Sequence, residues 1–146
     1  MSGITITVDT SQWDDLSARL SNTLTSFVRT FLQQGTEVIQ QTMANTVPVK
    51  TGNLRASINS EINDTQSITR TNTGYGLFVD QPTAQHVIRP NISKFLRFQI
   101  GSQVIYAKEV FHPATKGAYF IQNTVDQVSS QLKTIAMNVW NSLIGG

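Results

Sequence analysis

The sequence contains no cysteine and few charged residues. Without thiols the chain can form neither a disulfide framework nor a thiolate zinc site, which is consistent with an intracellular origin. Charged residues make up 14% of the chain, against about 25% in ordinary globular proteins. Ser, Thr, Asn and Gln together account for 54 of the 146 residues. Because uncharged polar groups can be buried against a partner more cheaply than charges, this composition favours a component of an assembly over a soluble monomer coated with amides and hydroxyls.

Long apolar runs and the common catalytic motifs are also lacking. No run of about 18 or more apolar residues could cross a membrane, and the N-terminal residues alternate instead of forming the apolar core of a secretion signal. There is no phosphate-binding loop, no dinucleotide-binding fingerprint and no His-Glu-x-x-His pair. We therefore expect a single domain over 1–146 with no enzymatic activity, no catalytic residues, no metal and no cofactor.

The N-terminal part of the chain predicts a short strand followed by a long helix. The strand is expected within 1–10, where β-branched residues alternate with others, and the helix over 11–46, with Ser11 as N-cap and Asp14 in the first turn. Its apolar stripe, which we expect to face the core, comprises Trp13, Leu16, Leu20, Leu24, Phe27 and Phe31. An unbroken helix of this extent would be about 54 Å long, so it either protrudes or bends near Gly35.

The rest of the chain predicts a small sheet and a second helix. Within the sheet region 57–110, the residues 75–79 alternate like a strand, and Gly101-Ser102 suits the turn of a tight hairpin. The segment 118–144 has the periodicity of an amphipathic helix whose charge-poor outer face contacts either solvent or another subunit. The predicted fold class is α+β, with the two helices packed on a small, mostly antiparallel sheet.

Candidate chemical groups are concentrated between residues 75 and 116. His86 and His112 could meet with Asp80 in a metal or acid–base cluster, although we favour structural roles for the histidines. The aromatic residues of this region interleave with basic ones, as in a stacking platform for nucleic acid, although we prefer to interpret them as the core of a sheet. They are Tyr75, Phe78, Phe95, Phe98, Tyr106 and Phe111.

The segment 86–116 carries a mild excess of positive charge. Five basic residues face a single acidic one, Glu109, which gives a net charge of +4. The five are Arg89, Lys94, Arg97, Lys108 and Lys116. We regard them as candidate contacts to a partner or to nucleic acid.

Three strings then follow one another in a fixed order. The first runs over 47–58 and includes Pro48, Thr51, Gly52, Leu54, Arg55 and Ser57. Pro48 is expected to end the long helix, Thr51 to cap the next turn and Gly52 to adopt a positive φ. The second string begins at Tyr75, and the third, over 112–121, includes His112, Pro113 and Phe120.

This order and spacing resemble the neck proteins of tailed bacteriophages, in the head–tail joining or tail-completion family of siphophages and myophages, to which the minor tail protein Z group is related. The resemblance extends over about residues 10–143. Two positions depart from the family pattern, because Gln81-Pro82-Thr83 follows Asp80 where Gly-Thr is usual, and Ala114 replaces a common Gly. The contacts of the loop 81–86 are therefore not inferred from the family.

The resemblance implies a structural virion protein, assembled in the host cytoplasm, that forms a ring of six copies at the head–tail interface. The ring would lie between the portal or head-closure proteins and the tail terminator or tail tube, and DNA would pass through its lumen. In that setting the basic residues of 86–116 would face the lumen or a partner. Two alternatives remain open: a nucleic-acid-binding domain that uses 86–116, and a metal-dependent hydrolase around Asp80, His86 and His112.

Overall fold

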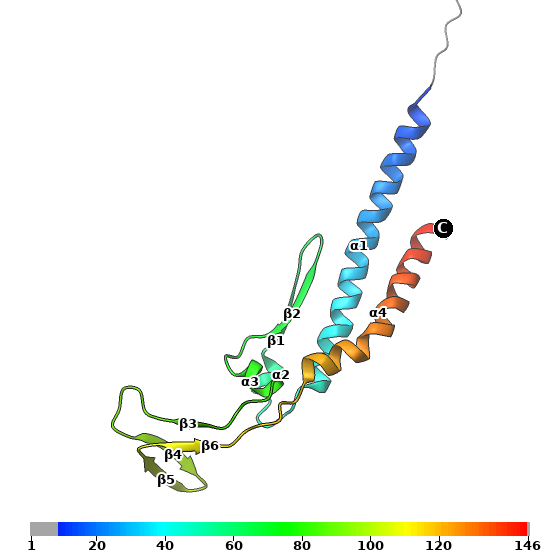
Figure 1. The fold of residues 1–146 in the computed structure, drawn as a ribbon. Coiled ribbons are helices and arrows are strands. Elements are labelled where there is room, and N and C mark those ends of the chain that lie inside the picture. Colours follow the sequence, from blue (N-terminus) through cyan, green and yellow to red (C-terminus); the bar gives the residue numbers. More distant parts are fainter. Residues whose placement is uncertain (1–8, 146) are drawn as a thin grey trace, which may run out of the picture.

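The computed structural model describes residues 9–145 of the chain (Figure 1). In chain order its elements are α1 (Ser11–Thr46), α2 (Asn53–Ala56), β1 (Ile58–Ile62), β2 (Ser67–Thr71), α3 (Gly76–Asp80), β3 (His86–Ile88), β4 (Leu96–Ile100), β5 (Gln103–Ala107), β6 (Val110–His112) and α4 (Phe120–Ile144). The α+β class predicted from the sequence is confirmed, with a long N-terminal helix, a C-terminal helix and small antiparallel sheets. The strand expected from Ile4, Ile6 and Val8 lies outside the described residues.

Helices α1 and α4 lie side by side and run in opposite directions (Figure 1). Near the C-terminal end of α4, the ring of Trp140 meets that of Phe27 edge to face, with 5.7 Å between the ring centroids. At the other end, the hydroxyls of Thr46 and Thr124 lie 2.7 Å apart. Within residues 9–145 no helix is both long enough and apolar enough to span a membrane.

Helix α1 continues through Gly35 and protrudes (Figure 1). Gly35 is buried, and a β-carbon at this position would lie 3.0 Å from Cδ2 of Leu132. The glycine therefore permits a close approach of α1 and α4. The predicted N-cap is wrong by one residue: Thr10 occupies that position without a side-chain bond, Ser11 is already helical, and its N–H donates to Asp9 Oδ1 at 2.9 Å.

The apolar core is small and lies where α1 ends and α4 begins. It consists of Met43, Val47, Leu54, Ile58 and Phe120. These residues come from α1, the residue after it, α2, β1 and α4, so the cluster joins segments that are distant in the sequence. It thereby fixes where the β1–β2 hairpin and the start of α4 lie relative to α1.

The N-terminal half of the α1 stripe is not part of this core, contrary to expectation. Trp13, Leu16, Leu20 and Leu24 are 46–69% exposed, because the N-terminal turns of α1 extend beyond the end of α4 (Figure 1). At Phe27 the stripe meets α4: the ring of Phe27 contacts that of Trp140, and it stacks on Phe31 with 5.9 Å between the ring centroids.

The strands form three separate two-stranded antiparallel sheets rather than one. The β1–β2 hairpin packs against α1. The β3–β6 and β4–β5 pairs together form a projection, residues 86–112, that points away from the helices and is here called the arm (Figure 1). The hairpin predicted around Gly101-Ser102 is present, and Gly101 has a φ of +59° at its turn.

The strand expected over 75–79 is wrong, because this segment contains the short helix α3. The N–H of Val79 donates to the carbonyl of Tyr75 at 3.2 Å, which closes a helical turn. Gly76 is buried so tightly that a β-carbon there would lie 2.4 Å from Thr71 Oγ1. Close packing against β2 therefore overrides the apolar alternation of the segment.

Candidate functional site

The three strings that carry the family resemblance meet in the core. Leu54 and Ile58 of the first string pack in one cluster with Phe120 of the third, which is only 1% exposed. The hydroxyl of Ser57 donates to the Leu54 carbonyl at 2.7 Å, which fastens the turn between α2 and β1. Arg55 points to the exposed side of the same short helix. The apolar residues of the strings thus hold together the end of α1, the first hairpin and the start of α4.

The loop after α1 corrects one prediction about the first string. Pro48 follows the helix and is exposed, and Gly52 has the positive φ that was expected, +83°. Gly52, however, is also the N-cap of α2, and no side chain caps this helix. The Thr51 hydroxyl lies 3.5 Å from the backbone nitrogen of Asn53, at the limit for a hydrogen bond. Thr51 is therefore not the N-cap that the sequence predicted.

Asp80 joins α3 to the start of α4 through its buried carboxylate. The side chain is 2% exposed, and its Oδ1 accepts the N–H of Ile121 at 2.9 Å. Its Oδ2 accepts a bond from Gln81 Nε2 at 2.6 Å, and its carbonyl accepts the N–H of Tyr119 at 2.8 Å. The carboxylate thus satisfies a free N–H at the N-terminus of α4, where helices favour negative charge. No local sequence pattern indicates this role of Asp80, because the two partners are 41 positions apart.

The two histidines do meet, but without Asp80. His86 and His112 are register partners across the β3–β6 pair, and their rings stack with 5.0 Å between centroids and 26° between planes. Nδ1 of His86 lies 2.9 Å from the carbonyl of Ala84, and Nδ1 of His112 lies 3.0 Å from the carbonyl of Pro113. Within the described part of the chain, no three acidic or histidine side chains form a group that could hold a metal. The cluster of all three residues is therefore not formed.

The stacked histidines line a mostly apolar hollow of about 650 Å³ at the base of the arm. Its wall also includes Tyr75 and Phe78, which precede and belong to α3, and Thr83 and Thr115. The last two form an isolated antiparallel bridge in which each N–H donates to the carbonyl of the other. The arm is thus fixed to the body beside this hollow.

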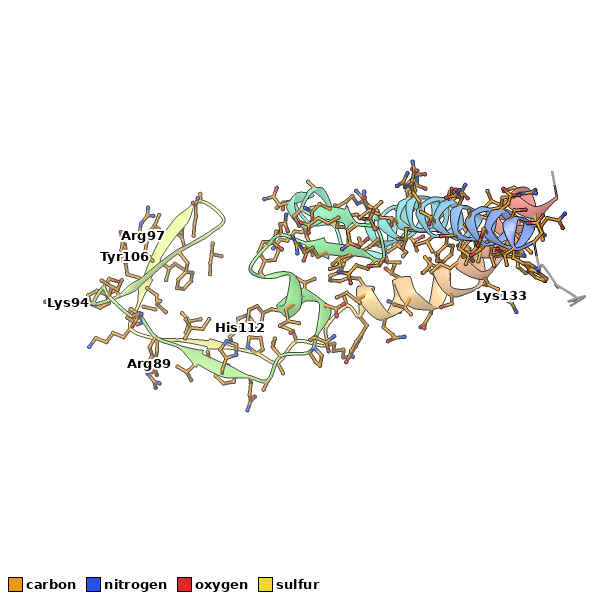
Figure 2. The ribbon with its side chains drawn as sticks, turned by 90° about the horizontal axis from the view of Figure 1, so that it is seen from above. Arg89, Lys94, Arg97, Tyr106, His112 and Lys133 are labelled. Atoms are coloured by element: carbon orange, nitrogen blue, oxygen red, sulfur yellow. The ribbon has the colours of Figure 1, made fainter. Side chains whose placement is uncertain are left out.

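The basic residues of the arm are exposed and gather toward its far end. Lys94, Arg97 and Tyr106 lie there, away from the helices (Figure 2). Arg89 is paired with Glu109, with 3.0 Å between Nη2 and Oε2. Arg97, Lys94 and Lys108 form no ion pair within residues 9–145. Lys116 is also exposed, but it lies outside the arm in the segment that leads to α4.

The aromatic residues of this region are not the core of a sheet, contrary to our preferred interpretation. Five of them are 44–64% exposed: Tyr75, Phe78, Phe95, Tyr106 and Phe111. Phe98 is half-buried. Among the described residues, no helix or further sheet packs on the paired strands of the arm (Figure 1), so its aromatic side chains are available to a partner.

A second exposed surface lies at the opposite end of the molecule, on residues 9–24, here called the helix tip. Its apolar side chains follow one face of α1, and its charged residues are Asp9, Asp14, Asp15 and Arg19. Hydrogen bonding from the Ser11 side chain and backbone N–H lowers the pKa of the exposed Asp9. The helix tip therefore combines an apolar stripe with a net charge of −2.

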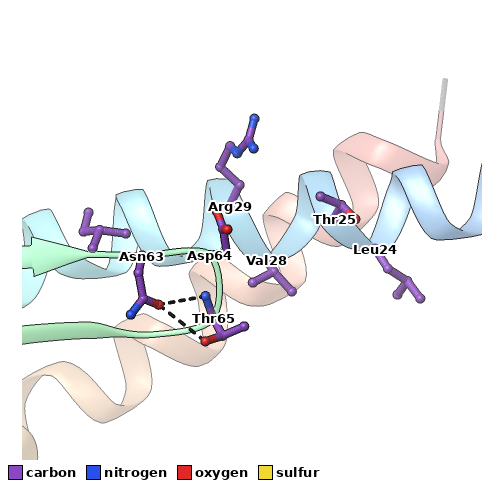
Figure 3. Close-up of a pocket in the computed structure, with 8 residues that line it drawn as sticks. Leu24, Thr25, Val28, Arg29, Asn63, Asp64 and Thr65 are labelled. Carbon is purple, nitrogen blue, oxygen red and sulfur yellow. Dashed lines mark hydrogen bonds between the residues drawn. The ribbon is translucent and has the colours of Figure 1, made fainter.

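The helix tip continues into a shallow hollow beside the first hairpin (Figure 3). This hollow of about 610 Å³ lies between Leu24, Val28 and Arg29 of α1 and the turn that connects β1 to β2. The turn is held by Asn63 Oδ1, which accepts the N–H of Thr65 at 3.0 Å. The hairpin therefore offers a fixed edge next to the apolar stripe.

The comparison with protein families agrees with the resemblance inferred from the strings. Residues 14–81 match a family described as "Bacteriophage HK97-gp10, putative tail-component". The matched segment contains most of α1, the first string, the first hairpin and α3. No curated protein and no solved structure matches the chain. The resemblance to phage neck and tail-completion proteins is thus confirmed over residues 14–81, where the chain is similar to the HK97-gp10 family of bacteriophage tail components.

Proposed function

We propose that the protein is a ring-forming subunit of the phage neck with no catalytic activity. Copies of it would lie between the portal or head-closure proteins and the tail terminator or tail tube, complete the tail for joining to the head and leave a lumen for DNA. The resemblance to tail components supports the location. The size of the exposed surface supports assembly into a ring.

The observation that carries this proposal is an accessible surface of 11455 Å² for a chain of 16.1 kDa. A compact monomer of that mass exposes about 7,400 Å². The excess, about 4,000 Å², is in the range that obligate interfaces bury. A subunit that contacts one neighbour on each side would remove surface of this order from water.

The distribution of apolar side chains also favours a ring. A closed ring of identical copies is built from heterologous contacts, so each subunit needs two different surfaces. The helix tip and the arm are two such surfaces, and they differ in structure and in charge. The helix α4, whose only charged residue after Asp126 is Lys133, could also be covered by a neighbour without burying many charges.

The mild positive charge of the arm is compatible with a passage for DNA. A strongly basic lumen would bind the phosphates tightly through release of counterions and would slow the passage of DNA. Here Arg89 is already paired with Glu109. Lys94, Arg97, Lys108 and Lys116 would give each subunit a modest attraction for DNA or for an acidic neighbour.

The experiment that tests this function is electron microscopy of particles assembled without the protein. We expect DNA-filled heads and complete-length tails that remain unjoined, and we expect joining to be restored when wild-type protein is added to the lysate. Normal numbers of joined, infectious particles in its absence would overturn the proposal.

A second candidate, a nucleic-acid-binding domain that uses 86–116, is favoured by the exposed aromatics of the arm. Tyr106 and Phe111 lie on the same projection as Lys94 and Arg97, as a stacking platform requires. This function predicts binding that weakens steeply with salt and that falls when Arg89 and Arg97 are replaced with Ala, but not in a Lys133→Ala control. A mobility assay that shows no salt-dependent complex would reject it.

A further inference from the structure

The apolar stripe of α1 continues past the point at which α4 stops covering it. Phe27 meets Trp140, and α4 ends at Ile144, about one turn later. Because the helices are antiparallel, the residues of α1 before about Leu24 have no counterpart on α4 (Figure 1). Leu16 and Leu20 keep the spacing of the covered part of the stripe, yet each is more than half exposed. The helix tip therefore presents the geometry of a helix-packing face on which no other element of residues 9–145 is packed.

The arm has the complementary properties. Apolar side chains cover it, among them Ile92, Ile100 and Tyr106, of which Ile92 is 99% exposed. Its net charge is +3, since four basic residues face only Glu109 over residues 86–112. The helix tip, in contrast, has a net charge of −2. The two surfaces are thus both apolar and opposite in charge.

We propose that the helix tip of one subunit docks on the arm of a second copy of the same chain. The arm and the helix tip lie at opposite ends of the molecule, so they cannot meet within one chain (Figures 1 and 2). A contact between two different surfaces of identical subunits is heterologous and repeats from copy to copy. Asp14 and Asp15 would lie near Lys94 and Arg97, where opposite charge sets the orientation of the pair. This inference rests on the proposed function, for which it names the contact between copies.

Cross-linking tests the contact directly, because the chain has no cysteine of its own. Ser17 lies on the exposed helix tip and Tyr106 on the arm, so Ser17→Cys and Tyr106→Cys are made separately and the two proteins are mixed with a short bismaleimide. We expect a cross-linked heterodimer from the mixture, and a ladder of larger products from the double variant. As a matched control, the Gln127→Cys protein, whose cysteine lies on the exposed face of α4, is mixed with either variant in place of the other. This mixture should give at least tenfold less cross-linked heterodimer. No heterodimer, or cross-links only between two Ser17→Cys chains, would overturn the proposal.

Charge reversal supplies a second, independent test. The double variants D14K/D15K and K94E/R97E should each weaken self-association at low salt by at least tenfold, as measured by sedimentation. The quadruple variant should recover most of that loss, because the opposite charges are exchanged rather than removed. Lys133→Glu on α4 is the control and should leave association unchanged. Docking of the helix tip on the arm would be contradicted if the two double variants weakened self-association no more than the Lys133→Glu control. It would also be contradicted if the quadruple variant recovered none of the loss.

The outcomes separate this inference from the function on which it rests. Heterologous cross-links together with open filaments, instead of closed rings, would support the docking and refute the ring. Closed rings that form normally in D14K/D15K and give no Ser17–Tyr106 cross-link would support the ring and refute the docking.

Discussion

The carboxylate of Asp80 accepts the backbone N–H of Ile121 at 2.9 Å, and this buried bond ties α3 to the first turn of α4. The residue that directly precedes α4, Tyr119, provides no side-chain cap and adopts a left-handed conformation with a φ of +50°. The N-terminus of α4 is therefore stabilised by a side chain from a distant segment. Since α4 starts at Phe120 in the core, this bond also orients the core.

Replacement of Asp80 with Ala should destabilise the fold by about 1–3 kcal/mol, because it leaves the N–H of Ile121 without a partner in a buried place. Asp80→Asn keeps an acceptor but loses the charge at the helix end, so it should cost less, about 0.5–1 kcal/mol. Urea denaturation gives both values. Asp64→Ala, in the exposed turn of the first hairpin, is the control, and an equal effect of Asp64→Ala and Asp80→Ala would contradict the role assigned to Asp80.

Replacement by alanine at three glycines should lower the stability of the protein to three different extents. At Gly117 the φ is +61°, and a β-carbon would lie 2.6 Å from the backbone carbon of Gln81, so we expect a loss of more than about 2 kcal/mol or failure to fold. At Gly101 the φ is also positive but the space is open, so only the backbone strain, about 1 kcal/mol, remains. At Gly74 neither constraint applies. Thermal unfolding of the three variants should rank them in this order, and a neutral Gly117→Ala would show that residue 117 does not lie against the backbone of Gln81.

Gly35 tests the close contact between the long helices. Gly35→Leu should destabilise the protein by about 1–3 kcal/mol through overpacking against Leu132. Gly35→Ala should change stability little, because the gain in helix propensity, about 1 kcal/mol, offsets the tight contact. The double variant G35L/L132A should recover part of the loss of Gly35→Leu. Additive losses in the double variant, measured by urea denaturation, would show that the two residues do not share this contact.

Phe27 and Leu20 belong to the same stripe, yet they should behave differently. From the sequence alone, an Asp at either position is expected to unfold or disperse the protein. In the structure Phe27 contacts Phe31 and Trp140, whereas Leu20 is 54% exposed. Phe27→Asp should therefore cost several kcal/mol of stability, while Leu20→Asp should fold normally and fail to assemble. Circular dichroism combined with sedimentation distinguishes the two, and an unfolded Leu20→Asp protein would contradict the exposure of the helix tip.

The sequence predicted the elements whose signals are long or chemically distinct. The 3.6-residue period persists through both long helices, and Gly101-Ser102 marks its hairpin with a glycine of positive φ. A window of five residues, such as 76–80, is too short for alternation to separate a strand from a helical turn. Packing of Gly76 against Thr71 decided that case.

The candidate site was less predictable, because its features depend on tertiary arrangement. The pairing of Asp80 with Ile121 spans 41 positions and has no local signal. The exposure of Tyr106 or Leu20 depends on whether another layer covers the arm or the helix tip, and the apolar pattern alone does not contain that information. The meeting of His86 and His112, by contrast, was considered from the sequence, because they are the two histidines of the chain. In the structure they are register partners on β3 and β6.

Cryo-electron microscopy of the head–tail junction in assembled particles tests the central claim most directly. We expect a closed ring of identical copies around an open lumen, in which the long α1 helices can be fitted and each helix tip lies against the arm of the next subunit. A junction without this protein, or isolated copies whose helix tips and arms contact only solvent, would contradict it.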